Sequence, residues 1–278
     1  MTRRSTWIAQ LLVVLFVALG LKLHYSTATP EQLRWILAPT TTLVEIVSGT
    51  SFRFESHAGY MSSDHTFLIA ASCAGVNFLI TAFLMLTLRR VWTDRRQSRG
   101  WSFIPVTGLL AYLTTIVANT VRICVALHLR ELPRHKSWLD PNQLHRSEGI
   151  FIYFGFLLLL FMLTEKPRSA RFIDLLKRSL FPLVIYYATT FGIPLVNGAY
   201  RQGGEFWEYS IFVFFIPWLL VVPLAALNSS WFKAGRAMMW PLRITKGKNE
   251  NGFDASSPAS RTNGVQPRRY FLWFRAEP

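Results

Sequence analysis

Six apolar runs separated by polar segments dominate the pattern of this chain. Most of them are long enough to cross about 30 Å of hydrocarbon, which takes about 20 helical residues. The fourth run is shorter, so we expect its helix to begin earlier, in the polar segment before it. The runs cover residues 7–21, 67–88, 103–127, 149–163, 179–197 and 210–227. The pattern predicts an all-α, polytopic membrane bundle of about six transmembrane helices.

Basic residues are divided unequally between the two sides of this predicted bundle. With the N-terminus inside, the inner segments hold 21 of the 30 Lys and Arg residues and the outer segments hold eight. Because Lys and Arg concentrate on the cytoplasmic side of membrane proteins, we expect both termini in the cytoplasm. The net charge of +15 follows from this topology, and we expect no nucleic acid as a partner.

The long first outer segment, between the first and second runs, contains proline and glycine residues that predict where its helices end. Pro39 should break a helix, and Gly49 is a natural helix end. We therefore expect one or two short helices at the outer interface, followed by an ordered loop at residues 50–66.

The chain divides into three predicted parts. Residues 1–165 hold the first four runs and all of the candidate chemistry. Residues 166–227 hold two proline-interrupted spans without intramembrane charge, which we expect to form an accessory hairpin. Residues 228–278 form a basic cytoplasmic tail, whose composition favours disorder and attraction to anionic membrane lipids.

Arg122 is the one charged residue inside the third run. An arginine in a span costs roughly 2.5–3.5 kcal/mol on insertion scales, so it normally faces protein or a water-filled cavity. Asn119 lies one turn earlier and continues a polar stripe on the same face. These features favour a buried, working arginine; the alternative is that the guanidinium extends to the interface from the nearby helix end.

Cys73 lies about two turns into the second predicted span, in the stretch SCAGVNF. A nearby guanidinium would stabilise the thiolate, which is the nucleophilic form of cysteine. Asn77 follows four residues later, and Gly75 lets another backbone approach closely. Two alternatives stay open: an inert buried cysteine, and a disulfide to Cys124 in an oxidising compartment.

His145 stands just before the fourth run and can serve as general acid and base, because imidazole titrates near neutral pH. Under the predicted topology it reaches the outer face at a depth similar to that of Cys73 and Arg122. These three groups converge if the second, third and fourth spans pack together. No HxxxH or HExxH spacing is present, so we expect neither a metal site nor a cofactor.

Three stretches, SCAGVNF, ANTVRI and HRSEGIFIYF, resemble the cysteine, arginine and histidine motifs of the exosortase/archaeosortase family. This is a family of membrane transpeptidase-like proteases. Together with the upstream APTTTLVEIVSGTSF, the first stretch is most similar to the compact branch called exosortase K. The resemblance covers roughly residues 5–165. Many family members have Cys-Ser-Gly where this chain has Ala74 before Gly75, so one hydroxyl is missing here.

The resemblance implies a thiol protease or transpeptidase of the bacterial inner (plasma) membrane, with its active site on the periplasmic or extracellular side. Its substrates would be exported proteins with a C-terminal sorting signal, which combines a short motif, a transmembrane helix and a basic cluster. Cys73 would attack the scissile carbonyl and form a thioacyl-enzyme, while Arg122 would stabilise thiolate and oxyanion. His145 would protonate the leaving amine and then activate the acceptor, for which water, a lipid and an extracellular polymer stay open.

Two other functions fit the same residues. In a membrane acyltransferase, Cys73 would carry a lipid acyl chain. In a transporter or assembly scaffold, Arg122 would bind an anionic ligand without catalysis. The sequence lacks the paired broken helices in matching halves that are typical of many transporters, which favours an enzyme.

Overall fold

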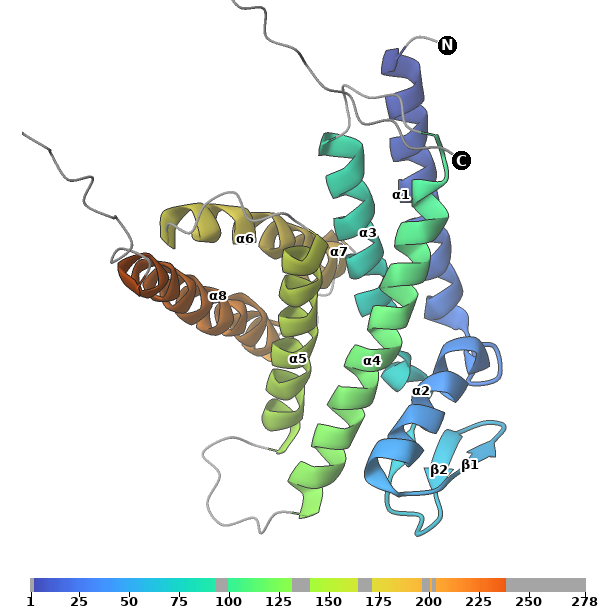
Figure 1. The fold of residues 1–278 in the computed structure, drawn as a ribbon. Helices are drawn as coiled ribbons and strands as arrows, with labels where there is room; N and C mark the ends of the chain where they lie inside the picture. The colour runs from blue at the N-terminus through green and yellow to red at the C-terminus, as the bar shows by residue number, and fades with distance from the viewer. Residues whose placement is uncertain are drawn as a thin grey trace, which may run out of the picture. The chain divides into compact units, whose positions relative to one another are not determined.

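Long helices account for most of the chain (Figure 1). The computed structural model describes residues 3–93, 100–131, 141–164, 172–196, 201 and 204–238. The helices are α1 (Arg3–Thr27), α2 (Arg34–Ser48), α3 (Val76–Thr93), α4 (Phe103–Glu131), α5 (Pro141–Thr164), α6 (Phe172–Tyr187), α7 (Ile193–Val196) and α8 (Gly204–Met238). A 3-10 turn (Ala71–Ala74) precedes α3, and a π-helical segment (Ala188–Gly192) joins α6 to α7. The part Met1–Ala237 forms one compact unit.

Five helices among the described residues are long and apolar enough to cross a membrane. They correspond to the first, second, third, fourth and sixth predicted runs. The segments are Thr6–Thr27, Ala71–Trp92, Phe103–Leu129, Arg146–Thr164 and Phe206–Ala226. The prediction of a largely helical chain with several membrane-length helices is confirmed, and α5 begins at Pro141, earlier than its apolar run. The tail beyond Met238 lies outside the described residues, so its predicted disorder stays a prediction.

The fifth predicted span, 179–197, is not one continuous α-helix. It is divided among α6, the π-helical segment and α7. Within the π-helical segment, the hydroxyls of Thr189 and Thr190 donate to the carbonyls of Ile185 and Tyr186. Side-chain hydroxyls that bond to preceding carbonyls compete with the regular backbone pattern. Of the six expected spans, this is the one that the described part of the chain does not contain as a membrane-length helix.

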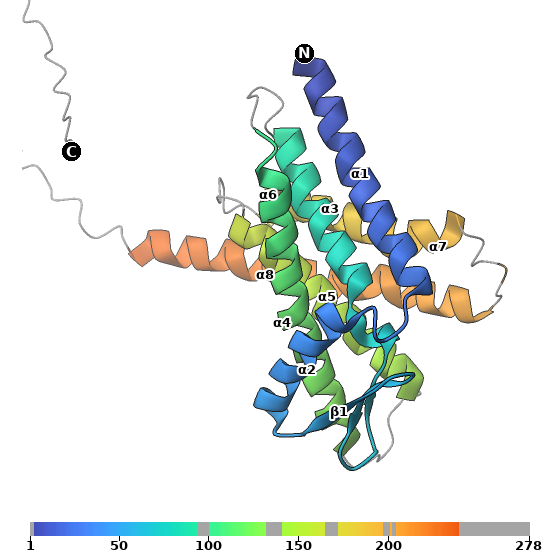
Figure 2. The ribbon, with the colours of Figure 1, turned by 90° about the vertical axis from the view of Figure 1, so that its right-hand side faces the viewer.

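α1, α3, α4 and α5 run roughly alongside one another in both views (Figures 1 and 2), and α3 packs against α1, α4 and α5. Their shared core contains the fully buried side chains of Met85, Phe154 and Leu157. α6 packs against α3 and α5. The start of α1 and the end of α3 lie at one end of these helices, and α2 and the strands lie at the other. Under the predicted topology, the end with α2 and the strands faces outward.

A single helix, α2, stands where one or two interface helices were expected. Pro39 lies inside it and does not break it, contrary to the prediction. Proline lacks the N–H that would bond to the carbonyl of Trp35, four residues earlier. The hydroxyl of Tyr112 on α4 donates to the Trp35 carbonyl at 2.6 Å, and the rings of Tyr112 and Trp35 stack on one another. α2 ends at Gly49, whose φ is 71°, as predicted.

Removing the Tyr112 hydroxyl takes away the donor that replaces the missing N–H of Pro39. We expect Tyr112→Phe to lower the free energy of unfolding by about 1 kcal/mol, measured as a lower thermal midpoint of the full chain in detergent. Pro39→Ala returns an N–H to the Trp35 carbonyl, so the double variant should recover most of this loss. If Tyr112→Phe lowered the free energy of unfolding equally in the wild-type and Pro39→Ala proteins, this role of the hydroxyl would be contradicted.

Residues 50–66, expected to be a loop, form most of a small antiparallel sheet, so the chain is not wholly α-helical. The strands are β1 (Phe52–Glu55), β2 (Gly59–Ser62) and β3 (Leu68–Ile69), in the order β1-β2-β3. Side chains alternate between partly buried and exposed along β1, which is the period of a strand. Gly59 has a φ of 123°, and a Cβ there would collide with the carbonyl of Ile69. The sheet leads directly into the turn that carries Cys73.

Candidate active site

Cys73 lies on the 3-10 turn Ala71–Ala74 and not inside a helix, contrary to the prediction. The turn ends at Gly75, whose φ of 70° is in the left-handed region that glycine adopts without a Cβ clash. α3 begins only at Val76. Cys73 therefore lies at the very start of its span, beside α2 and β3, rather than two turns within the helix.

A chain of hydrogen bonds ties this turn to α4 and α5. The side-chain amide of Asn119 on α4 donates to the backbone carbonyl of Cys73. The hydroxyl of Tyr153 on α5 donates to Asn119 Oδ1 at 2.8 Å, and Arg122 donates to the Tyr153 hydroxyl at 3.3 Å. Asn119 is fully buried, so these partners satisfy a polar group that would otherwise be costly to bury. The second, third and fourth predicted spans thus meet at this turn.

Gly75 lies where side chains of α4 and α5 approach the turn most closely. A Cβ built on Gly75 would lie 3.3 Å from side-chain atoms of Asn119 and Thr115, and 3.4 Å from the Tyr153 hydroxyl. The close approach expected at Gly75 is therefore made by polar side chains rather than by another backbone.

Gly75→Ala should cost more stability than a left-handed alanine elsewhere, because it also crowds these side chains. Gly49 offers a matched control, since its φ is 71° and nothing lies within 4 Å of a Cβ built there. We expect Gly49→Ala to cost about 1–2 kcal/mol and Gly75→Ala more, measured by unfolding in detergent. Only Gly75→Ala should also change the rate at which a maleimide labels Cys73. Equal losses of stability, with unchanged labelling, would contradict a packing role for Gly75.

Arg122 lies within the protein rather than extending to the interface. Its guanidinium carbon is 5.4 Å from the centroid of the Tyr153 ring. A Cβ on Gly149 would lie only 3.0 Å from Arg122 Nε, so this glycine provides space for the arginine. Arg122 is also within range of electrostatic interactions with the Cys73 thiol and the Glu148 carboxylate. These contacts favour the buried arginine over the extended one.

His145 lies near the start of α5, and its side chain is outside the part that the structure describes. Its backbone position is four residues before Gly149 and eight before Tyr153, and residues at these spacings share a helix face. Position 145 therefore falls on the face of α5 that contacts Arg122. The structure places Cys73 and Arg122 in one hydrogen-bond network and within electrostatic range of one another, while the contribution of His145 stays a prediction.

Asn77, expected to support Cys73, has another partner. Its Oδ1 accepts a hydrogen bond from Lys22 Nζ on α1 at 2.8 Å, and its backbone carbonyl accepts one from the Thr81 hydroxyl. The prediction assumed that Cys73 and Asn77 lie one turn apart on the same α-helix. They do not, because α3 begins after Cys73. Asn77 belongs to the contact between α1 and α3.

The alternative of a disulfide between Cys73 and Cys124 is not seen, because both cysteines are free. Cys124 is two residues after Arg122 on α4, so it points roughly 200° away around the helix. Within the described ranges, no three His, Cys, Asp or Glu side chains are placed to hold a metal ion.

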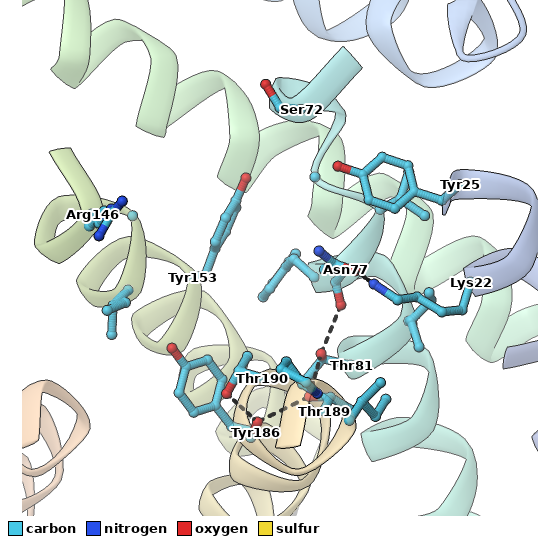
Figure 3. A pocket seen from close by; sticks show the side chains of 18 of the residues that line it. Lys22, Tyr25, Ser72, Asn77, Thr81, Arg146, Tyr153, Tyr186, Thr189 and Thr190 are labelled. Carbon is cyan, nitrogen blue, oxygen red and sulfur yellow. Dashed lines mark hydrogen bonds between the residues drawn. The ribbon is translucent and has the colours of Figure 1, made fainter. Parts of the chain in front are cut away.

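A cavity of about 430 Å³ adjoins the Cys73 turn. Its lining includes Ser72 and Gly75, on either side of the cysteine, together with Arg122 and Tyr153. The Cys73 side chain is partly buried and packs against the hydrophobic core beside the cavity. Figure 3 shows Tyr153 and Asn77 extending into the same space from α5 and α3. The cavity gives a ligand access to the network that holds Cys73.

Sequence patterns do not single out Tyr153 or Lys22, although both are central to this geometry. The signal for Tyr153 is its helical spacing from His145 within HRSEGIFIYF, which places both on one face. The Tyr153 ring stacks on Phe78 of α3 at 5.0 Å and so is fixed between two spans. Lys22 lies at the end of the first apolar run, where a basic residue is ordinary, and only the folded chain shows its contact with α3.

Comparisons with known proteins add no family to these observations. No family model matches the chain, and searches of curated proteins and of solved structures found no match. The similarity to exosortase motifs therefore stays a prediction from sequence, and the geometry around Cys73 is the evidence on which a functional proposal has to stand.

Proposed function

We propose that the chain is a membrane cysteine protease or transpeptidase of the exosortase type. In this proposal it cleaves exported proteins at a C-terminal sorting signal. One observation carries the proposal: the carbonyl of Cys73 is held by Asn119, which is held by Tyr153, which is held in turn by Arg122. An inert buried cysteine needs no such support from two other spans. The network fixes the Cys73 turn relative to Arg122, which interacts electrostatically with the thiol.

The proposed chemistry begins with the Cys73 thiolate, stabilised by the positive charge of Arg122. Between apolar helices this attraction is stronger than in water, because the effective dielectric constant is lower. The sulfur attacks the scissile carbonyl, and the guanidinium stabilises the negative charge that develops on the carbonyl oxygen. The C–N bond breaks, the leaving amine takes a proton from His145, and a thioester remains on Cys73.

The second half of the proposed reaction releases the acyl group from Cys73. His145 removes a proton from an acceptor O–H or N–H group, and the acceptor attacks the thioester carbonyl. The carbon–sulfur bond breaks and the thiolate returns beside Arg122. Water as acceptor gives proteolysis, an amine gives transpeptidation, and a hydroxyl group of a lipid or polymer gives an ester.

The proposed location is the outer border of the plasma membrane. The turn that carries Cys73 packs against α2 and β3, and the excess of basic residues predicts that the start of α1, at the other end of the helices, is cytoplasmic. A substrate helix lying beside α3, α4 and α5 would present the peptide at its outer end to Cys73. Its basic cluster would stay on the inner side and fix its depth.

Co-expression with a reporter tests the proposal. The reporter is an exported protein ending in a motif, a transmembrane helix and a basic cluster, taken from the genome that encodes this chain. We expect the wild-type chain to cleave it on the N-terminal side of the helix, with no cleavage when the helix or the cluster is deleted. A fatty acyl label on Cys73, with the reporter intact, would indicate the acyltransferase instead. Ligand transport that survives Cys73→Ala would indicate the transporter.

A further inference from the structure

Three cationic side chains from three different helices line the cavity beside the Cys73 turn. They are Lys22 of α1, Arg122 of α4 and Arg146 of α5, and the described lining contains no Asp or Glu. Glu148 interacts electrostatically with Arg122 but does not line the cavity. In the view of Figure 3, Arg146 and Lys22 lie on opposite sides of the space, with Tyr153 between them.

This arrangement leaves an excess of positive charge around one cavity that is open to the surroundings. Like charges repel more strongly among apolar helices than in water, because the effective dielectric constant is lower. Cations between membrane spans are costly unless they face a partner or a water-filled cavity. A ligand that carries negative charge would offset this repulsion, so the cavity favours anions.

Hydroxyl groups also line the wall formed by α6, the π-helical segment and α8. They belong to Tyr186, Thr189, Thr190 and Tyr209. Thr189 is fixed to α3 by a 2.8 Å hydrogen bond between its hydroxyl and that of Thr81. Tyr209 lies within electrostatic range of both Arg122 and Arg146. The predicted accessory region 166–227 therefore forms part of the cavity and faces the same cations.

The size and the remaining lining indicate more than a single inorganic ion. A volume of about 430 Å³ falls within the range of about 300–1,000 Å³ that is usual for small-molecule sites. Phe78, Ile150 and Ile193 contribute apolar surface between the polar groups. The cavity thus offers a positively charged centre for an anion, with room for an attached organic part.

We propose that this cavity binds a phosphate group, either free or as the headgroup of an anionic lipid. A phosphate presents several oxygens and up to two charges, which suits donors that approach from three helices. Guanidinium groups match its geometry with paired hydrogen bonds. Binding of phosphate does not require Cys73, so this inference goes beyond the proposed catalytic function and does not depend on it.

Three soluble probes test the inference on the full chain in a neutral detergent. They are dihexanoyl phosphatidic acid, inorganic phosphate and, as the zwitterionic control, dihexanoyl phosphatidylcholine. Affinity is measured by native mass spectrometry and by the shift of the thermal midpoint. Tighter binding of phosphatidic acid than of phosphatidylcholine would support the site with a lipid as the source. An equal shift with inorganic phosphate would support it with free phosphate as the source.

Charge-removing variants then locate the binding. We expect Arg146→Gln and Lys22→Gln each to lower the affinity for the anionic probe by about tenfold. Arg146→Lys should lower this affinity less. Arg53 is exposed on β1, outside the cavity, so Arg53→Gln is the matched control and should bind as wild type. No preference of the wild-type chain for either anionic probe, or equal weakening by Arg53→Gln, would overturn the inference.

Discussion

Cys73→Ala should abolish cleavage of a reporter that carries the sorting signal, while the protein stays folded. The thiol is the proposed nucleophile, and removing the nucleophile of a covalent mechanism costs roughly 10⁴-fold or more in rate. The hydrogen bond from Asn119 goes to the backbone carbonyl of Cys73, so the turn keeps this contact in the variant. The measurement is the fraction of reporter cleaved in membranes, with the thermal midpoint recorded on the same protein.

Cys124→Ser is the matched control for this experiment. It removes the other thiol of the chain, which lies on a different face of α4 from Arg122, and both cysteines are free. We expect its cleavage rate to stay within about twofold of wild type, since a conservative change away from a site has little effect. Equal damage by Cys124→Ser and Cys73→Ala would return support to a structural pairing of the two cysteines.

Arg122→Gln should lower the cleavage rate by about 10²–10³-fold, the usual loss when one group that stabilises an oxyanion is removed. Glutamine keeps a polar side chain but lacks the charge that the Cys73 thiolate requires. The loss should appear in kcat more than in KM, because the charge on the substrate oxygen develops only in the transition state.

Two further variants separate charge from position in this prediction. Arg122→Lys keeps the charge without the planar fork, so we expect a loss smaller than that of Arg122→Gln. Tyr153→Phe keeps the ring that stacks on Phe78 but removes the hydroxyl between Arg122 and Asn119. We expect this variant to change the pH profile of cleavage while the ring contacts stay intact. Full activity of Arg122→Gln would contradict any electrostatic role for the arginine.

The approach of Cys73 to Arg122 could be predicted only in part, because the length and direction of the spans are local features of the sequence, whereas their packing is not. Apolar length predicts the spans, and the distribution of Lys and Arg predicts their direction. The predicted depth of Cys73 was wrong, because its turn precedes α3. The structure places Cys73 and Arg122 within electrostatic range of one another. His145 was predicted at a similar depth by the same reasoning. Its backbone position lies on the face of α5 that contacts Arg122.

Other features depend on contacts between distant segments, which periodicity does not show. Pro39 reads as a helix breaker because the Tyr112 hydroxyl that replaces its missing hydrogen bond is 73 positions away. The sequence does not show that the 3-10 turn is separate from α3, because Gly75 lies within a continuous apolar run. The φ of Gly75 follows from the fold. The bond between Lys22 and Asn77 joins residues 55 positions apart. In each case a tertiary partner overrides a local pattern.

The region after the fourth span shows the same limit. Its lack of charge suggested an accessory pair, yet Thr189 and Tyr209 line the cavity beside the Cys73 turn. The π-helical segment that carries Thr189 breaks the fifth predicted span, and π-helical turns are often found at functional sites. The division into parts at residues 165 and 166 stays a prediction.

The central claim is that the Cys73 thiol, held beside Arg122, takes the acyl group of the substrate. Its most direct test is mass spectrometry of the Cys73 peptide from a His145→Ala variant co-expressed with the reporter, since a slowed second step should leave the thioester in place. The account predicts a reporter fragment joined to Cys73 through a bond that hydroxylamine cleaves, and its absence when Arg122→Gln is added. A reporter adduct on another residue, a lipid acyl chain on Cys73, or an unmodified Cys73 would contradict it.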